Sequence, residues 1–162
     1  DQQLRLVGLE NIPSLMRDID LDRDGWLELL MSEVLEPKLA GFERPVMVYD
    51  FPASQAQLAK IHTDEQGHEV AARFELYAGG LELANGYDEL LDAGELRRRF
   101  EHDNQQRLAL GKAPMPLDEH LLAAMTSGLP QCVGVALGLD RLLMLVLKQR
   151  DIQQVQSFPF NQ

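Results

Sequence analysis

Apolar side chains recur three and four positions apart in several stretches of the chain, a spacing that predicts amphipathic helices. Residues 1–40 are expected to be helical, with a break at the segment NIPSL and a helix over 26–36 that Pro37 ends. Three further helices are predicted at residues 92–112, 118–130 and 140–150. The first of these would begin at the capping residue Asp92.

Between the helices, shorter runs favour β-strands. The segment RPVMVYDFP, residues 44–52, is rich in β-branched and aromatic side chains. Two similar runs within residues 69–90 flank the tripeptide AGG, which is typical of a β-hairpin. An apolar run punctuated by glycine, at 131–139, leads into the last helix. Strands flanked by helices predict an α+β fold built around an antiparallel β-sheet.

An acidic segment, DIDLDRDG at residues 18–25, resembles the start of a calcium-binding loop. Counting from Asp20, however, the twelfth position is Met31, where such a loop needs a bidentate glutamate. A thioether is a poor ligand for a hard cation. We therefore expect Asp22 or Asp24 to cap a helix rather than to bind calcium.

Length and composition are those of an ordinary globular protein. The 162 residues, 45% hydrophobic and 25% charged, suit one domain covering 1–162. No stretch approaches the roughly 20 apolar residues that a membrane-spanning helix needs. The net charge of −11 argues against a basic nucleic-acid-binding surface, and the single cysteine, Cys132, is compatible with the reducing cytoplasm. The arginines at 97–99 are expected to form a solvated helix face, with a substrate contact as the alternative.

Two glutamates flank the expected hairpin turn. If Ala78 and Gly79 form a two-residue loop, Glu75 lies directly opposite Glu82, about 5 Å away on the same face of the sheet. Two like charges so close need a positive partner, and Mg²⁺ on a nucleotide triphosphate is suitable. The alternatives are a turn shifted by one residue, or glutamates that face water or an arginine.

The segment ELANGYDEL, which follows the turn, carries Asn85, Tyr87 and Glu89 at alternate positions. If the strand continues past Gly86, an amide, an aromatic ring and a carboxylate could together hold a cationic amino acid. Asn-Gly is also a common turn sequence. On spacing alone, the turn is favoured.

The glycine-punctuated run GVALGLDRLLML combines Gly134 and Gly138 with Arg141 at the start of the last helix. Glycine lets a flat ligand approach a strand closely, and an arginine at a helix N-terminus suits phosphate. The alternative is a packed corner in which Arg141 pairs with Asp140 or Glu82.

Taken together, RFELYAGGLELANGYDEL and GVALGLDRLLML closely resemble the C-terminal half of class II lysyl-tRNA synthetases over roughly residues 44–162. A narrower resemblance is to the lysyl-tRNA synthetase paralogues that modify elongation factor P. It rests on the segments WLELLMSEVLEPKL, YDFPASQAQLAKI and GLPQCVGVALGLDRLLML.

The resemblance implies a class II synthetase catalytic fold and a role for each candidate residue. Glu75 and Glu82 would hold Mg²⁺ on ATP, and Arg141 would clamp the γ-phosphate, serving as the catalytic residue. The lysine pocket and the floor beneath the substrate and adenine would be formed by Asn85, Tyr87, Glu89, Gly134, Ala136 and Gly138. Glycine is common in tRNA-charging enzymes where this chain has Ala136, so its methyl group would trim the pocket in favour of one lysine isomer.

The resemblance also implies an activity and its partners. A cytoplasmic, homodimeric parent enzyme would use ATP and Mg²⁺ to activate lysine or β-lysine and transfer it to a lysine of elongation factor P. The class II motifs 1 and 2 are missing from the 162 residues, so we expect a C-terminal portion that is inactive alone. The alternatives are a lysyl-tRNA synthetase, with tRNA the less favoured acceptor, and an inactive synthetase-like binding module.

Overall fold

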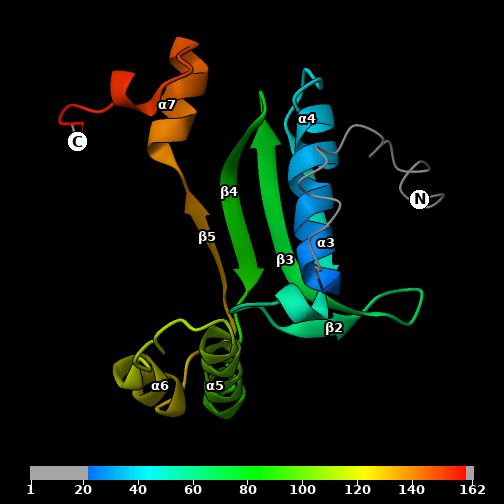
Figure 1. The fold of residues 1–162 in the computed structure, drawn as a ribbon, viewed down its shortest axis with the longest axis vertical. Coiled ribbons are helices and arrows are strands. Elements are labelled where there is room, and N and C mark those ends of the chain that lie inside the picture. The colour runs from blue at the N-terminus through cyan, green and yellow to red at the C-terminus, as the bar shows by residue number, and fades with distance from the viewer. Residues whose placement is uncertain (1–21, 160–162) are drawn as a thin grey trace. The chain divides into compact units, whose positions relative to one another are not determined.

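A computed structural model of the chain describes residues 22–159, which contain one five-stranded β-sheet as well as helices (Figure 1). The strand order is β1-β3-β4-β5, and the short strand β2 pairs with β3 in antiparallel register. This confirms the expected α+β fold with an antiparallel sheet. The strands are β1 (Val46–Pro52), β2 (Ile61–Thr63), β3 (Glu69–Ala78), β4 (Leu81–Asp88) and β5 (Val133–Leu137).

The hairpin between β3 and β4 turns at Gly79 and Gly80. Their φ angles are 57° and 79°, and a two-residue turn with positive φ at both positions matches the right-handed twist of the strands it joins. The expected loop at Ala78-Gly79 is therefore wrong by one residue. The reason is conformational: Ala78 has a Cβ atom and stays extended at the end of β3, whereas both glycines tolerate the left-handed region.

The first described helix is capped by Asp22, as expected, but it begins before residue 26 and continues past residue 36. The expected helix and break within residues 1–21 lie outside the described residues. The carboxylate of Asp22 accepts a hydrogen bond from the backbone N–H of Gly25 at 2.8 Å, which makes Asp22 the cap. Pro37 does not end the helix. The α-helix α3 (Arg23–Leu30) passes through a π-helical segment (Met31–Leu35) into α4 (Glu36–Leu39), with Pro37 in its first turn. Proline lacks a backbone N–H and its ring crowds the turn before it. The wider π-helical turn that precedes Pro37 accommodates both effects, so the helix continues.

The other predicted helices are confirmed. They are α5 (Ala93–Ala109), α6 (Glu119–Thr126) and α7 (Leu139–Leu147), with short 3₁₀ turns at Ala53–Gln55 and Ile152–Gln154. Asp92 caps α5 and Asp118 caps α6, each through its side chain. Helices α5 and α6 pack together around the buried side chains Leu96, Leu122 and Met125.

The described residues form two compact units. One comprises 22–48, 75–84 and 137–159, and the other comprises 49–74 and 85–136. The first carries Glu75, Glu82, Gly138 and Arg141, whereas the second carries the other candidate residues. A single domain over residues 1–162 stays a prediction. Within residues 22–159, no helix has the length and apolar character to cross a membrane.

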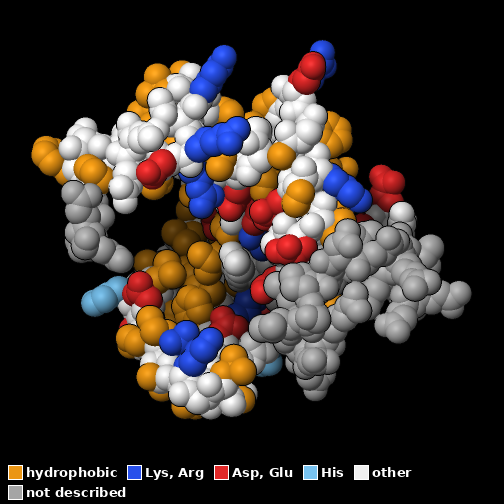
Figure 2. All heavy atoms as spheres, turned by 45° about the horizontal axis from the view of Figure 1, so that its top comes forward, with side chains coloured by type: hydrophobic (Ala, Val, Ile, Leu, Met, Phe, Trp, Pro, Cys, Tyr) orange, Lys and Arg blue, Asp and Glu red, His pale blue; other side chains and the backbone are white. Residues whose placement is uncertain are grey.

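Strand β5 is the last strand in the sheet order, and some of its side chains are exposed to solvent. Val133 and Val135, which alternate along the strand, are 80% and 63% exposed. Hydrophobic side chains also lie on the surface among acidic and basic groups in the space-filling view (Figure 2). The described part of the chain therefore leaves one sheet edge with apolar side chains in solvent.

Candidate functional site

The carboxylate pair of the hairpin lies in the first compact unit. Glu75 is buried, 7% exposed, and accepts a hydrogen bond from the Tyr77 hydroxyl at 2.6 Å. Burial, and then this hydrogen bond and the nearby glutamate charges, raise the pKa of the Tyr77 phenol far above its ordinary value, so Tyr77 stays a donor. The strand ends place Tyr77 opposite Glu82. Glu75 and Glu82 therefore share a face as diagonal neighbours, about 7–8 Å apart, rather than as the expected directly opposed pair.

Arg141, at the start of α7, contacts the backbone and the side chain of Glu82. Its Nη1 atom donates to the Glu82 carbonyl at 2.9 Å and lies 3.4 Å from the carboxylate. The carboxylate of Asp140 instead accepts from Gln156. The structure therefore has the Arg141–Glu82 pairing that the sequence left open as an alternative. This ion pair is half exposed, so solvent weakens it and ligand oxygen atoms can compete for the guanidinium.

Gly138 is the single residue between the end of β5 and the start of α7. Its backbone N–H donates to the carbonyl of Leu83 at 2.8 Å, which ties the helix start to β4. A Cβ atom at Gly138 would lie 3.6 Å from the stem of Arg141. Gly138 thus brings Arg141 next to the hairpin.

In the second unit, strand β4 continues through Gly86 to Asp88, so the favoured turn at Asn85-Gly86 is wrong. Gly86 serves close packing instead. A Cβ atom there would overlap the ring of Phe74 and lie 3.0 Å from the carbonyl oxygen of Gly134. Asn85 and Tyr87 consequently alternate along one extended strand, and their side chains share a face.

The adjacent carboxylates Asp88 and Glu89 have different environments. Asp88 forms an ion pair with Lys60 at 2.7 Å. Glu89 has no hydrogen-bond or ion-pair partner for its carboxylate within residues 22–159, and this group lies against Gly134. A side chain at Gly134 would occupy the same space as the Glu89 carboxylate. Gly134 therefore provides the space in which an unpaired negative charge is held.

Sequence reasoning missed Arg73, which joins the residues of this unit. Its guanidinium lies 4.3 Å from the ring centroid of Phe51 and 5.9 Å from that of Tyr87. It also donates to the side-chain oxygen of Asn85 at 3.3 Å and to the carbonyl of Gln55 at 3.2 Å. The available signal was a basic residue within the strand, two positions before Glu75.

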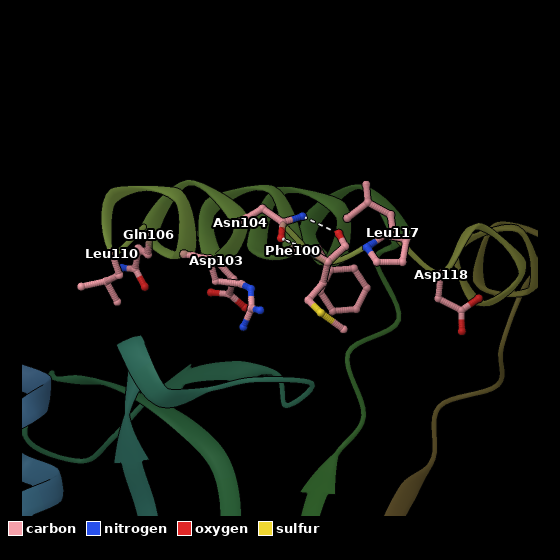
Figure 3. Close-up of a pocket in the computed structure, with 10 residues that line it drawn as sticks. Phe100, Asp103, Asn104, Gln106, Leu110, Leu117 and Asp118 are labelled. Carbon is pink, nitrogen blue, oxygen red and sulfur yellow. Dashed lines mark hydrogen bonds between the residues drawn. The ribbon is translucent and has the colours of Figure 1, made fainter. Parts of the chain in front are cut away.

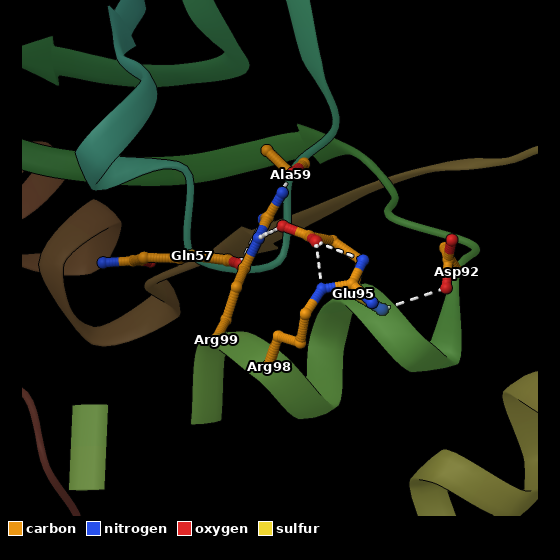
Figure 4. A network of polar contacts seen from close by, with 6 residues as sticks. All are labelled: Gln57, Ala59, Asp92, Glu95, Arg98 and Arg99. Carbon is orange, nitrogen blue, oxygen red and sulfur yellow. Dashed lines mark hydrogen bonds and ion pairs between the residues drawn. The ribbon is translucent and has the colours of Figure 1, made fainter. Parts of the chain in front are cut away.

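The arginine run on α5 is only partly solvated, and the expectation for Arg99 is wrong. Arg99 reaches from α5 to the carbonyls of Gln57 and Ala59, at 2.7 and 2.8 Å, and its side chain is 18% exposed (Figure 4). Glu95 orients Arg99 and also pairs with Arg98 (Figure 4). Arg99 leads the causes that lower the pKa of Glu95, followed by Arg98.

The hydrogen bonds of Arg99 to the loop at Gln57 and Ala59 indirectly support the candidate residue Tyr87. The side chain of Gln57 accepts a hydrogen bond from the Tyr87 hydroxyl at 2.6 Å. Arg99 therefore fixes the backbone of the residue that holds Tyr87. Among residues 22–159, the hydrogen bonds of Arg99 go to Glu95, Gln57 and Ala59 and to none of the candidate site residues.

A hollow of about 450 Å³ lies beside α5 (Figure 3). Asn104 closes one side of it by bonding both backbone polar atoms of Met115. Its lining includes Phe100 and Leu117 but none of the candidate site residues. The candidate residues therefore do not line this hollow.

Comparison with known proteins identifies the family of the chain. Residues 24–162 match the family model described as tRNA synthetases class II (D, K and N). The chain therefore belongs to the class II tRNA synthetase family. This confirms the family resemblance inferred from the hairpin and the glycine-punctuated strand.

Three curated relatives carry the name elongation factor P–(R)-β-lysine ligase. The Edwardsiella ictaluri protein is 52% identical over 156 residues, which is 96% of this chain and 47% of the relative. The Proteus mirabilis protein is 49% identical over 158 residues, covering 98% and 48%. The Vibrio parahaemolyticus protein is 54% identical over 139 residues, covering 86% and 42%. The chain spans a little under half the length of these relatives.

Proposed function

We propose that the protein carrying this chain activates lysine or (R)-β-lysine with ATP and joins it to a lysine of elongation factor P. The observation that carries this proposal is the Glu89 carboxylate against Gly134, which has no partner among residues 22–159 and follows Asn85 and Tyr87 at alternate positions. A negative charge without a protein partner, next to an aromatic ring and an amide, suits the ammonium group of a cationic amino acid. The name shared by the relatives supports both the amino acid and the acceptor.

Glu75 and Glu82 are proposed to hold Mg²⁺ on the phosphates of ATP. The donor set fits, because both side chains are carboxylates on one face of a hairpin and Mg²⁺ prefers carboxylate and phosphate oxygen atoms. When bound, the metal ion would neutralise phosphate charge. Within residues 22–159, no group of three or more histidine, cysteine or acidic side chains could hold an ion by itself. A site with two protein ligands completed by phosphate is consistent with that finding.

Arg141 is proposed to bind the γ-phosphate. In the structure its guanidinium rests on Glu82, so ATP binding would exchange a carboxylate for phosphate oxygen atoms. Gly138, at the N-terminus of α7, would let the adenine ring approach the chain closely. Positioning and charge neutralisation are sufficient for this step, and no general base is required.

The chemistry then proceeds in two transfers. The amino-acid carboxylate attacks the α-phosphorus atom, forming a P–O bond and breaking the bond to the β-phosphate, so pyrophosphate leaves. The amine of the acceptor lysine next attacks the carbonyl carbon of the adenylate, forming an amide and releasing AMP. Ala136 is proposed to shape the pocket for the β-isomer, because its methyl group removes space that glycine would leave. We also propose a cytoplasmic homodimer as the working form.

The test uses the full-length protein that contains this chain. It is incubated with ATP, Mg²⁺, labelled lysine or (R)-β-lysine, tRNA and elongation factor P together. Label on elongation factor P supports the proposal. Label on tRNA would identify a lysyl-tRNA synthetase instead, and label on neither would favour a binding module without catalysis.

A pair of neighbouring substitutions tests the observation about Glu89. Glu89→Gln removes the unpaired charge and should raise the KM for the amino acid by about tenfold or more, since a hydrogen bond to a charged group contributes about 1.5–3 kcal/mol. Asp88→Asn, the matched control, alters the carboxylate that pairs with Lys60 and should leave this KM within about twofold. Equal effects of the two substitutions would refute the assignment of Glu89.

A further inference from the structure

We propose that Arg73 is a positioning residue that fixes which atoms of the Asn85 amide face the substrate. This inference rests on the proposed function, in which Asn85 contacts the amino acid. The contact that carries it is the hydrogen bond from Nε of Arg73 to the Oδ1 atom of Asn85, at 3.3 Å. The relatives' names and the family model assign no role to Arg73.

A guanidinium group can only donate hydrogen bonds, so the atom of Asn85 that faces it must be the oxygen. The amide nitrogen of Asn85 therefore points away from Arg73 with two N–H donors. Within residues 22–159 that nitrogen has no hydrogen-bond partner. Without Arg73, the amide could rotate by half a turn, because the terminal torsion of asparagine has two broad minima. Arg73 removes the orientation that would present oxygen to the substrate.

Arg73 is itself held by groups from separate segments. The ring of Phe51, on β1, lies beneath its guanidinium, and the carbonyl of Gln55 accepts a second hydrogen bond. Tyr87, on β4, completes the aromatic surroundings. A planar, delocalised cation suits this stacked and forked arrangement, whereas a lysine ammonium does not.

The proposed amino-acid site has two chemically different ends. Asn85, Tyr87 and Glu89 alternate along extended backbone, because the strand β4 is followed by a bridge between Glu89 and Ala59. Donors at Asn85, next to the Arg73 cation, suit a carboxylate or carbonyl oxygen of the substrate. The Glu89 carboxylate suits an ammonium. Arg73 thus specifies the direction in which an amino acid lies in the site.

The test measures amino-acid-dependent ATP–pyrophosphate exchange with the full-length protein and its Arg73 variants. Arg73→Gln and Arg73→Lys should each raise the KM for the amino acid about tenfold and leave the KM for ATP within about twofold. Lysine should not rescue, because it lacks the Nε–H donor beside the stacked plane. Arg98→Gln, an exposed arginine on α5, is the matched control and should match the wild-type protein.

A double-mutant cycle separates positioning from general support of the fold. Because Arg73 is proposed to act through Asn85, Arg73→Gln should add no more than about twofold to the effect of Asn85→Ala. Fully additive effects, or equal changes in both KM values, would overturn the proposal. Asn85→Asp covers the case in which Arg73 variants fail to fold. It keeps a partner for Arg73 but replaces the donors by oxygen, so amino-acid binding, measured as a ligand-induced rise in Tm, should be lost.

The two proposals fail in different ways. A wild-type protein that shows no exchange and no Tm shift with either lysine isomer would overturn the proposed function. An active wild-type protein whose Arg73→Gln and Asn85→Asp variants bind the amino acid normally would overturn the role of Arg73 alone.

Discussion

The contact between Glu89 and Gly134 predicts that adding one methyl group at residue 134 weakens amino-acid binding. In Gly134→Ala, the new Cβ atom would take the space of a Glu89 carboxylate oxygen and lie 3.4 Å from the carboxylate carbon. The backbone at Gly134 needs no positive φ, so alanine causes no conformational strain there. The expected effect is therefore displacement of the Glu89 side chain rather than unfolding.

The magnitude follows from the interaction that Glu89 would lose. A hydrogen bond to a charged group contributes about 1.5–3 kcal/mol, and each 1.36 kcal/mol corresponds to a factor of ten. The KM for the amino acid should accordingly rise by about ten- to a hundredfold, with the KM for ATP nearly unchanged. Glu89 is partly exposed and can turn toward solvent, so Tm should fall by only a few degrees.

The assay is ATP–pyrophosphate exchange by the full-length protein across a range of amino-acid concentrations. Val133→Ala is the control, since Val133 is one residue away on β5 and 80% exposed. A Gly134→Ala protein with a wild-type KM would refute the reasoning. So would a further large increase when Gly134→Ala is added to Glu89→Gln, because the glycine would then act on something other than the carboxylate.

Two further predictions concern the hairpin and a helix cap. Tyr77→Phe removes the hydrogen bond to Glu75 and should weaken the binding of Mn²⁺, a spectroscopic substitute for Mg²⁺, by about tenfold or more. An unchanged affinity for Mn²⁺ would contradict a supporting role for Tyr77. Asp92→Ala should lower Tm at pH 7, because Asp92 caps α5. The hydrogen bond from the Glu95 backbone N–H lowers the pKa of Asp92, so its stabilisation is present above its ordinary pKa and is lost as pH falls through the lowered value. The difference in Tm should then vanish in thermal melts near pH 2, and a difference that persists there would contradict the capping explanation.

Local rules predicted the parts of the fold that depend on neighbouring residues. Asp92 and Asp118 begin helices because their side chains accept from backbone N–H groups three residues ahead, an interaction within one turn. The glycines of the hairpin turn were recognised, although the loop was misplaced by one residue. Pro37 was misjudged because the π-helical segment Met31–Leu35 lies just before it and the helix continues, and no local pattern indicated that segment.

The candidate site was predictable to the extent that it lies on single strands. Asn85 and Gly86 form a common turn sequence, yet the strand stays extended there, with Gly86 packed closely against Phe74 and Gly134. Similarly, the choice between Asp88 and Glu89 as the available carboxylate depends on Lys60, 28 residues away. Arg73 was missed because its partners lie on three different segments. Contacts between residues far apart in the sequence therefore decided the points that the sequence pattern could not settle.

The bare edge at β5 has a practical consequence for any preparation of these 162 residues on their own. Among residues 22–159, β5 is the last strand of the sheet, and an edge strand with exposed valines is a template onto which another molecule's strand can add. Such addition would grow with protein concentration and would be opposed only by the mutual repulsion of molecules carrying a net charge of −11. Salt screens that repulsion and would then favour aggregation. The isolated chain should therefore aggregate least in dilute solution at low ionic strength.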